Sequence, residues 1–369
     1  MQFIFKRLSI PKTLLLLVFL VSTSVDARSL IVITDMEPDD RIALILLAGL
    51  FPETISLVGT TGLHAGRKAA LARQLMDQLG LPGVPVVQGS GGISADYTDI
   101  TSSRAALSYR GEGVGLLPEA ELKSLSRDVP RSSDDLQNRI RDLLRSANDV
   151  EVVLLAPATD LLLALGSDPV LTTSLKHVHV MGGWSESTGP GNEIVRRTSY
   201  NWNMDPQAAA RLVQIEEVPM TVYSSHIIQQ DFSGGSINRD DFPEIIGLLE
   251  EKASQNQWAE SFFVASRSWD AHVMKQIPYL IPVIGEHAGQ QFTPADPVVA
   301  LGINDTELVT RLRAVEIRID LEDLNPAKGY KVSVKENSAS KIRLVEAIDT
   351  LNFNQQALSI IRRLKANNN

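Results

Sequence analysis

Cysteine is absent from all 369 residues of the chain. This absence excludes disulfide bonds, thiolate metal sites and a cysteine nucleophile. A chain of this length does not need covalent cross-links, because it can bury a core large enough for stability. Hydrophobic residues make up 44% of the composition, which is sufficient for such a core.

A basic excess is also absent. The chain has 35 Lys and Arg against 44 Asp and Glu, which gives a formal net charge of −9. Proteins that bind nucleic acid normally carry a basic surface, so we expect no nucleic-acid partner. The chain also lacks a Gly-x-Gly-x-x-Gly after its first strand and a Walker lysine, which argues against a Rossmann dehydrogenase and a P-loop kinase.

Long apolar runs are absent except near the start, where "TLLLLVFLV" occupies residues 13–21. A positively charged segment precedes this run, and small residues at Val25 and Ala27 follow it. This order is typical of a secretory signal peptide over residues 1–27. An uncleaved membrane anchor is the alternative, but the run is short for a bilayer span. We therefore expect export to the periplasm or the medium, no stable membrane span, and one mature domain over residues 28–369.

Apolar, β-branched runs alternate with amphipathic segments along the rest of the chain. Strands are expected at 30–34, 55–61, 85–89, 150–157, 177–183 and 220–224, and helices at 41–50, 67–80, 134–147, 159–169 and 205–214. The alternation predicts an α/β fold with a doubly wound, mostly parallel sheet flanked by helices. Ligands bind such sheets at the carboxyl ends of the strands. The polar, glycine-containing stretch at 90–133 is a candidate lid or binding loop.

Four carboxylates follow the first expected strand, in the sequence "VITDMEPDD": Asp35, Glu37, Asp39 and Asp40. Carboxylates this close together repel one another unless a cation lies between them. Oxygen ligands favour a hard ion such as Ca²⁺ or Mg²⁺. The alternative is a solvated turn in which Asp39 or Asp40 caps the following helix. The cluster alone does not decide between a metal site and a cap.

Further motifs follow in the order "LLAPATDLLLAL", "VHVMGG", "GNEIVRRTSYNWNMDPQAAA" and "ADPVVA". Together with "ITDMEPDDRIAL", they resemble the motifs of the inosine–uridine-preferring nucleoside hydrolase family. The resemblance covers nearly the whole mature chain, and the combination is specific although each piece alone is weak. It implies a nucleoside hydrolase-like fold with Ca²⁺ at the strand ends. It also implies metal-dependent hydrolysis of the N-glycosidic bond of ribonucleosides, and a homodimer or homotetramer.

The resemblance also implies roles for individual residues. The metal ligands would be Asp35, Asp40, the Thr159 carbonyl and Asp296, and Asp35 would also be the catalytic general base. The substrate would be contacted by Asp39, Asn192 and Asn201, and by Ser199 at the position of a family Glu. His64 and His226 fall at the ends of expected strands, facing the predicted site, and are further candidates for substrate contact. This chemistry explains the acidic cluster, because carboxylates stabilise the positive charge of an oxocarbenium-like transition state. A bound cation lowers the pKa of a water, whose proton a neighbouring Asp accepts.

The chain departs from the family pattern in the parts that contact the sugar and the leaving base. Ile33 replaces the first motif Asp, Met36-Glu37 replaces Pro-Gly, His64-Ala65 replaces Gly-Asn, Ser199 replaces a Glu, and Ala295 replaces a His. In part of the family, that His helps to protonate the departing base. Two rival functions follow: a hydrolase of another glycoside on the same scaffold, and a metal-dependent sugar- or nucleoside-binding protein without turnover.

The group that protonates the leaving base is left open by these departures. His272 and His287 precede Asp296 and are candidates, although a surface or capping role is the simpler reading for each. Trp184 or Trp202 would suit stacking on the base. Tryptophans are more often packed within a core, which is the alternative for both.

Overall fold

The computed structural model describes residues 28–62, 64–90, 133–147, 149–232, 235–276, 289–303, 307–325 and 329–364. The predicted signal peptide, most of the predicted lid at 90–133, and His287 lie outside these residues. Within the described part of the chain, no helix is long and apolar enough to cross a membrane.

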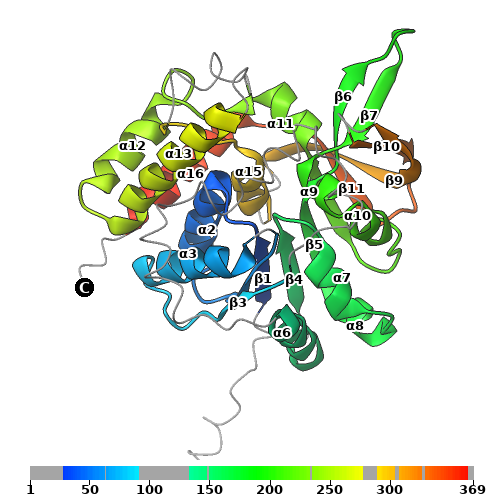
Figure 1. Ribbon diagram of the computed structural model, residues 1–369, viewed down its shortest axis with the longest axis horizontal. Coiled ribbons are helices and arrows are strands. Elements are labelled where there is room, and N and C mark those ends of the chain that lie inside the picture. Colours follow the sequence, from blue (N-terminus) through cyan, green and yellow to red (C-terminus); the bar gives the residue numbers. More distant parts are fainter. Residues whose placement is uncertain are drawn as a thin grey trace, which may run out of the picture.

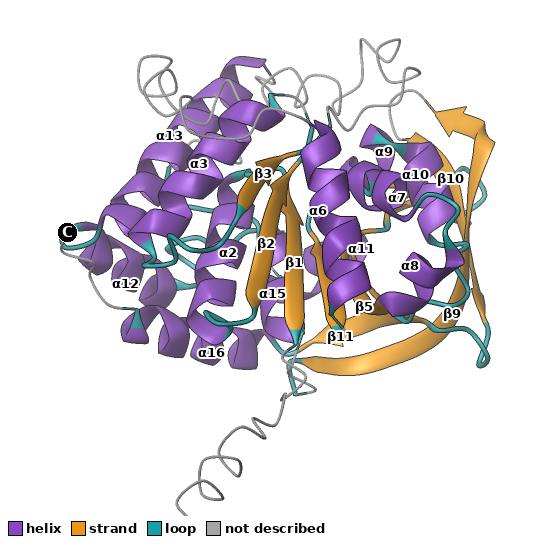
Figure 2. Ribbon diagram, turned by 90° about the horizontal axis from the view of Figure 1, so that it is seen from below, coloured by secondary structure: helices purple, strands orange, loops and turns teal. Residues whose placement is uncertain are grey.

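An 11-stranded sheet runs through the molecule in the order β3-β2-β1-β4-β5-β8-β11-β9-β10-β7-β6 (Figure 2). The strands are β1 (Ser29–Thr34), β2 (Ile55–Thr60), β3 (Val86–Gln88), β4 (Val150–Leu154), β5 (Leu175–Gly182), β6 (Trp184–Thr188), β7 (Ile194–Thr198), β8 (Met220–Ser224), β9 (Val309–Asn325), β10 (Gly329–Glu336) and β11 (Ile342–Ile348). From β3 to β11 the neighbours pair in parallel, and the strands beyond β11 pair antiparallel. This confirms the predicted mostly parallel sheet.

Helices cover both faces of the sheet (Figures 1 and 2). They are α2 (Pro38–Leu50), α3 (Ala65–Gln78), α6 (Ser133–Ser146), α7 (Thr159–Leu165), α8 (Pro169–Ser174), α9 (Tyr200–Met204), α10 (Pro206–Leu212), α11 (Ser225–Asp231), α12 (Pro243–Ala253), α13 (Gln257–Gln276), α15 (Ala295–Gly302) and α16 (Thr350–Arg363). One hydrophobic core joins α2, α3, α12, α13, α15 and α16 to the sheet, and a second joins α6, α7, α8 and α10. Because both faces are covered, β1 is apolar along nearly its whole length.

The order of the strands creates a crevice beside β1. The chain moves outward from β1 to β2 and β3, and then returns to the other side of β1 as β4. The loops that leave β1 and β4 therefore diverge to opposite sides, and ligands of doubly wound sheets bind at such a point.

A β-hairpin occupies the region where the motif comparison had placed a substrate-binding Asn. Strands β6 and β7 pair antiparallel and project from the body of the molecule (Figure 1). Asn192 is an exposed residue of their turn, with a positive φ of 63°. Its backbone N–H donates to the Gly189 carbonyl over 3.1 Å. Asn tolerates this left-handed conformation better than most residues, so the turn itself explains why Asn192 is present.

A charged cluster connects the start of the described chain to the central strands β4 and β5. The Arg28 guanidinium donates to Glu151 over 2.6 Å, and His179 Nε2 lies 3.1 Å from the same carboxylate. The Arg28 guanidinium also lies over the Phe51 ring, 5.1 Å from its centroid. Burial alone would raise the pKa of Glu151, but the hydrogen bonds and charges of His179 and Arg28 lower it to about 2. The ionised form of Glu151 therefore stabilises the fold.

Glu151→Gln is expected to reduce the free energy of unfolding at pH 7 by on the order of 1–3 kcal/mol. Because the folded pKa is depressed, the contribution of Glu151 is complete above its ordinary pKa of 4.5 and disappears as the pH falls toward about 2. Urea unfolding at a series of pH values should show a weaker acid dependence in the variant. Glu336→Gln, at an exposed position of β10, is the control. Identical pH profiles for Glu151→Gln and the wild type would contradict this assignment.

Candidate active site

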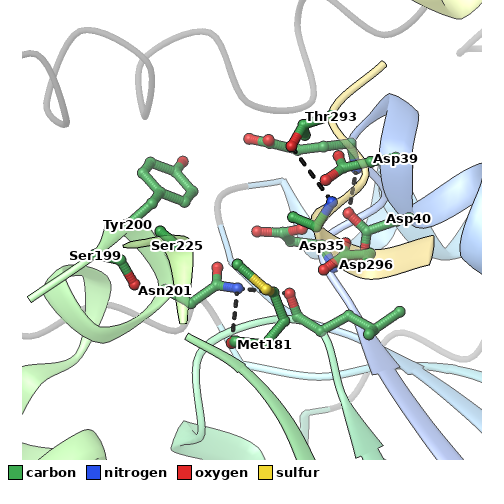
Figure 3. A pocket seen from close by; sticks show the side chains of 13 residues that line it. Asp35, Asp39, Asp40, Met181, Ser199, Tyr200, Asn201, Ser225, Thr293 and Asp296 are labelled. Atoms are coloured by element: carbon green, nitrogen blue, oxygen red, sulfur yellow. Dashed lines mark hydrogen bonds between the residues drawn. The ribbon is translucent and has the colours of Figure 1, made fainter. Parts of the chain in front are cut away.

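A pocket of about 180 Å³ opens where β1, β4 and β5 end. Its lining residues come from the strand ends and from the starts of four helices: Asp35, Glu37, Asp39, Asp40, Leu155, Met181, Ser199, Tyr200, Asn201, Ser225, Thr293, Ala295 and Asp296. Carboxylates brought by the β1–α2 turn and by α15 stand on one side (Figure 3). Polar side chains of α9 and of the residue before it stand on the other.

The turn from β1 into α2 holds Asp40 in a fixed orientation. The Thr34 hydroxyl donates to its carboxylate, as do the backbone N–H groups of Asp35 over 3.2 Å and Glu37 over 3.0 Å. The bond from Glu37 is half of a capping box that starts α2, with Pro38 at its first turn. The chain reaches this start through Met36, which adopts a left-handed φ of 58° although it is buried and is not glycine. The turn therefore carries backbone strain at the edge of the pocket.

Asp39, Asp40 and Asp296 form a buried acidic cluster. One carboxylate oxygen from each lies within 4.8 Å of the others, and the residues are 6%, 1% and 3% exposed. Burial raises the pKa of Asp296, and the charges of Asp40, Asp39 and Asp35 raise it further. Burial and the charge of Asp40 likewise raise the pKa of Asp39. No Lys, Arg or His is among the described residues that line the pocket.

The ligands of this cluster suit a hard cation. They are carboxylate oxygens only, and two of them lie in the first turn of α2. The positive end of that helix stabilises Asp39 and Asp40 only in part, because a helix end carries about half an elementary charge. A cation would neutralise the remainder, and Ca²⁺ and Mg²⁺ are the metals that prefer such ligands. The cluster is therefore able to hold a metal ion.

Asn201 stands on the opposite side, with its amide orientation set by the backbone. Its Nδ2 donates to the carbonyls of Leu155 over 2.6 Å and Met181 over 3.3 Å. The amide nitrogen is thus the donor in both bonds, and the amide oxygen is directed away from those two carbonyls (Figure 3). The Ser199 hydroxyl next to it is buried, without a hydrogen-bond partner among the described residues. Both side chains can therefore bond to hydroxyl groups of a ligand.

Residues 30–355 match the family model described as inosine-uridine preferring nucleoside hydrolase. The chain belongs to this family. It is therefore a hydrolase of N-glycosidic bonds, as the motif comparison predicted. A search of curated proteins found no match.

Solved nucleoside hydrolases share the fold. A purine-preferring ribonucleoside hydrolase from Gardnerella vaginalis superposes with a TM-score of 0.65 at 18% identity, covering 91% of this chain and 99% of that one. An inosine-guanosine nucleoside hydrolase gives 0.62 at 17% identity, with the same coverage. An inosine-uridine preferring enzyme from Bacillus anthracis gives 0.58 at 13% identity, again covering 91% and 99%. At these identities the likeness shows the fold.

Six of the residues expected at the site of this nucleoside hydrolase line the pocket: Asp35, Asp39, Asp40, Ser199, Asn201 and Asp296. The tight cluster differs from the predicted ligand set, because it contains Asp39, which was expected to contact the sugar. Asp35 lies at the same pocket, and its charge acts on Asp296.

Four expected residues do not line the pocket: Thr159, Asn192, His64 and His226. Thr159 begins α7, and its hydroxyl donates to Asp205 over 2.7 Å. His64 is exposed at the N-cap of α3, in a left-handed conformation. His226 belongs to a separate cavity, where its Nε2 lies 3.6 Å from Glu186. Asn192 lies in the hairpin turn described above.

The two tryptophans considered for base stacking are core residues. Trp184 and Trp202 are each 2% exposed and pack in the second hydrophobic core. The Trp202 indole lies against Gly182, where a Cβ atom would clash with it. The packing alternative therefore holds for both. The other candidates for the leaving group, the His272 side chain and His287, lie outside the described structure.

Motif comparison missed Tyr200, Ser225 and Thr293 as lining residues. Ser225 directly follows the last residue of β8, so the rule that ligands bind at strand ends would have found it. Tyr200 directly precedes Asn201, but nothing in the sequence pattern distinguishes its side chain from a core aromatic.

Asp296→Asn should change thermal stability in opposite directions with and without metal. In EDTA, the variant is expected to melt several degrees higher than the wild type, because a buried charge repulsion is removed. With Ca²⁺ at a hundredfold excess over its Kd, the wild type should gain roughly 2.7 kcal/mol, and the variant much less. Differential scanning fluorimetry measures both effects. Asp135→Asn, at an exposed position of α6, should behave as the wild type. A Ca²⁺ shift of equal size in Asp296→Asn would show that the ion binds elsewhere.

Proposed function

We propose that the mature chain is an exported, Ca²⁺-dependent hydrolase that cleaves ribonucleosides or closely related ribosides into free base and sugar. The observation that carries the proposal is the pocket itself. Buried carboxylates of the β1–α2 turn and α15 face the neutral polar side chains of Ser199 and Asn201 across a space of about 180 Å³. One side suits a cation and a developing positive charge, and the other suits sugar hydroxyls.

Asp39, Asp40 and Asp296 are the residues that would hold the cation, with Asp35 beside them. When bound there, Ca²⁺ would orient a water molecule and lower its pKa. The three donors on the Asp40 carboxylate keep it directed at the same point. This pre-orientation reduces the rearrangement needed on binding.

Asp35 is assigned as the general base. It lies at the end of β1 and lines the pocket, so it can accept a proton from the attacking water. The surrounding carboxylates then stabilise the positive charge that develops on the sugar as the N-glycosidic bond breaks. Asp39 accepts a hydrogen bond from a sugar hydroxyl, and so does the directed oxygen of Asn201. The Ser199 hydroxyl, which has no hydrogen-bond partner in the described part of the chain, serves as a further contact.

Purine ribosides are the favoured substrates within this class. Two of the structural neighbours are named for purine or inosine and guanosine preference, which motivates the assignment. The described lining lacks cationic side chains, which disfavours phosphorylated substrates. The signal-peptide pattern supports export to the periplasm or the medium. Assembly as a homodimer or homotetramer is proposed from the family resemblance.

A second candidate function is hydrolysis of another glycoside at the same pocket. Ser199 provides a neutral hydroxyl where the family motif has a carboxylate, so the sugar contacts differ from the family pattern. A binding protein without turnover is disfavoured, because binding alone does not require a water-activating carboxylate such as Asp35.

Release of reducing sugar from a panel of purine and pyrimidine nucleosides tests the proposal. The mature protein should act only with Ca²⁺ present and lose activity in EDTA. Asp35→Asn should lower kcat by about 10²–10⁴-fold, because the proton acceptor is removed. Asp135→Asn is the matched control on an exposed helix face.

The outcomes separate the candidates. Sugar release from other ribosides but from no nucleoside would favour the second candidate. Thermal stabilisation by nucleosides without any release would indicate a binding protein and contradict the proposal.

A further inference from the structure

We infer that Tyr200 donates the proton that the leaving base takes up when the N-glycosidic bond breaks. The inference rests on the proposed function and adds to it the general acid that the motif comparison left open. Its basis is the position of Tyr200 in the pocket, together with the chemistry of the other described lining residues.

Tyr200 lies across the pocket from the carboxylates that are proposed to bind the cation and to accept a proton from the attacking water. Asp35, Asp39 and Asp296 lie on the side formed by the β1–α2 turn and α15, and the Tyr200 ring lies on the side formed by α9 (Figure 3). In a displacement at an anomeric carbon, water enters on one face of the sugar and the leaving group departs from the other. A sugar bound between the two sides, with its attacked face toward Asp35, therefore directs its base toward α9.

On the side of the pocket away from the carboxylates, no other described lining residue is a comparable acid. On the side away from the carboxylates, the described lining consists of Leu155, Met181, Ser199, Tyr200, Asn201 and Ser225. A phenol, with a pKa of about 10, is far more acidic than an aliphatic hydroxyl or an amide. Tyrosine is also an established type of general acid in enzymes. Ala295, where the family motif has a His, carries no proton to donate.

The backbone around α9 holds Tyr200 in place. Thr198 just before the helix and Asn203 within it are joined by a side-chain hydrogen bond, and Asn203 Nδ2 donates to the Thr198 carbonyl over 3.0 Å. Asn201 is bonded to the ends of β4 and β5 through Leu155 and Met181. Contacts on both sides of Tyr200 therefore fix the short helix that carries it, as a positioned acid requires.

Asp35 and Tyr200 together account for every proton that is transferred in the reaction. The water oxygen bonds to the anomeric carbon, and one water proton passes to Asp35. The bond between the anomeric carbon and the base nitrogen breaks, and its electron pair stays on the base. The Tyr200 hydroxyl gives its proton to the base and becomes a phenolate. Transfer of the proton from Asp35 to the phenolate through solvent restores both residues after each turnover.

Two substrates with different leaving groups test the inference in the Tyr200→Phe variant. Inosine needs a proton on its departing base, whereas p-nitrophenyl β-ribofuranoside releases a stabilised anion that needs none. Tyr200→Phe is expected to lower kcat for inosine by about 10²–10³-fold. For the nitrophenyl riboside, kcat should stay within about threefold of the wild type, because the proton donor contributes little there.

A matched variant controls for the loss of a tyrosine hydroxyl. Tyr223 is buried on β8 and does not line the pocket, so Tyr223→Phe should leave both kcat values near those of the wild type. Circular dichroism and the melting temperature verify that both variants are folded.

Equal losses of kcat on the two substrates in Tyr200→Phe would assign the residue a structural role and overturn the inference. Unchanged rates on both would overturn it as well. Failure of the wild-type protein to cleave either riboside would instead contradict the proposed function, so the two failures are distinguishable.

Discussion

The fold buries several carboxylates close together, and their electrostatic repulsion is the constraint that determines what the site can bind. Asp39, Asp40 and Asp296 are buried with oxygens within 4.8 Å of one another, and no basic side chain of the described structure lines their pocket. At an effective dielectric constant of about 20, each pair of charges at that separation repels by roughly 3 kcal/mol. Three such pairs approach the whole stability of a typical domain, about 5–15 kcal/mol. A bound cation would remove this repulsion, whereas protonation would remove the charges that the proposed chemistry needs.

The rest of the fold delivers these groups to one point. Parallel strands end at the same edge of the sheet, and the divergence of the chain on either side of β1 opens the crevice there. The capping box at Glu37 fixes the start of α2, and α15 packs against α2 and brings Asp296 to the same place. Across the pocket, bonds from Asn201 to Leu155 and Met181 tie α9 to the ends of β4 and β5. The carboxylate side and the neutral polar side of the pocket are thus positioned by the same sheet.

The positions of β1, β2, β3, β4, β5 and β8 were predictable because both faces of the parallel part of the sheet are covered. The resulting apolar strands, such as "LIVIT" and "MTVYS", are visible in the sequence without any partner being known. Asp35, Asp39 and Asp40 were also predictable, since they directly follow such a strand. Asp296 lies far away in the chain and was placed only through the family motif.

Other residues could not be placed, because their roles depend on tertiary geometry. The Asn192 motif falls on the turn of a hairpin, and a local signature does not reveal which strands project from the body of the molecule. His226 follows a strand as Ser225 does, but the direction of α11 turns it into another cavity. Tyr200 could not be distinguished from a core aromatic until the structure showed which helix faces the carboxylates.

The most direct test of a cation between the carboxylates is anomalous diffraction from crystals of the mature protein grown with Ca²⁺. One strong peak is expected per chain, about 2.3–2.6 Å from carboxylate oxygens of Asp39, Asp40 and Asp296, which is the usual range for Ca²⁺–oxygen bonds. A well-ordered cluster with no peak at saturating Ca²⁺ would contradict the account, because the buried charges would then be held together by protonation.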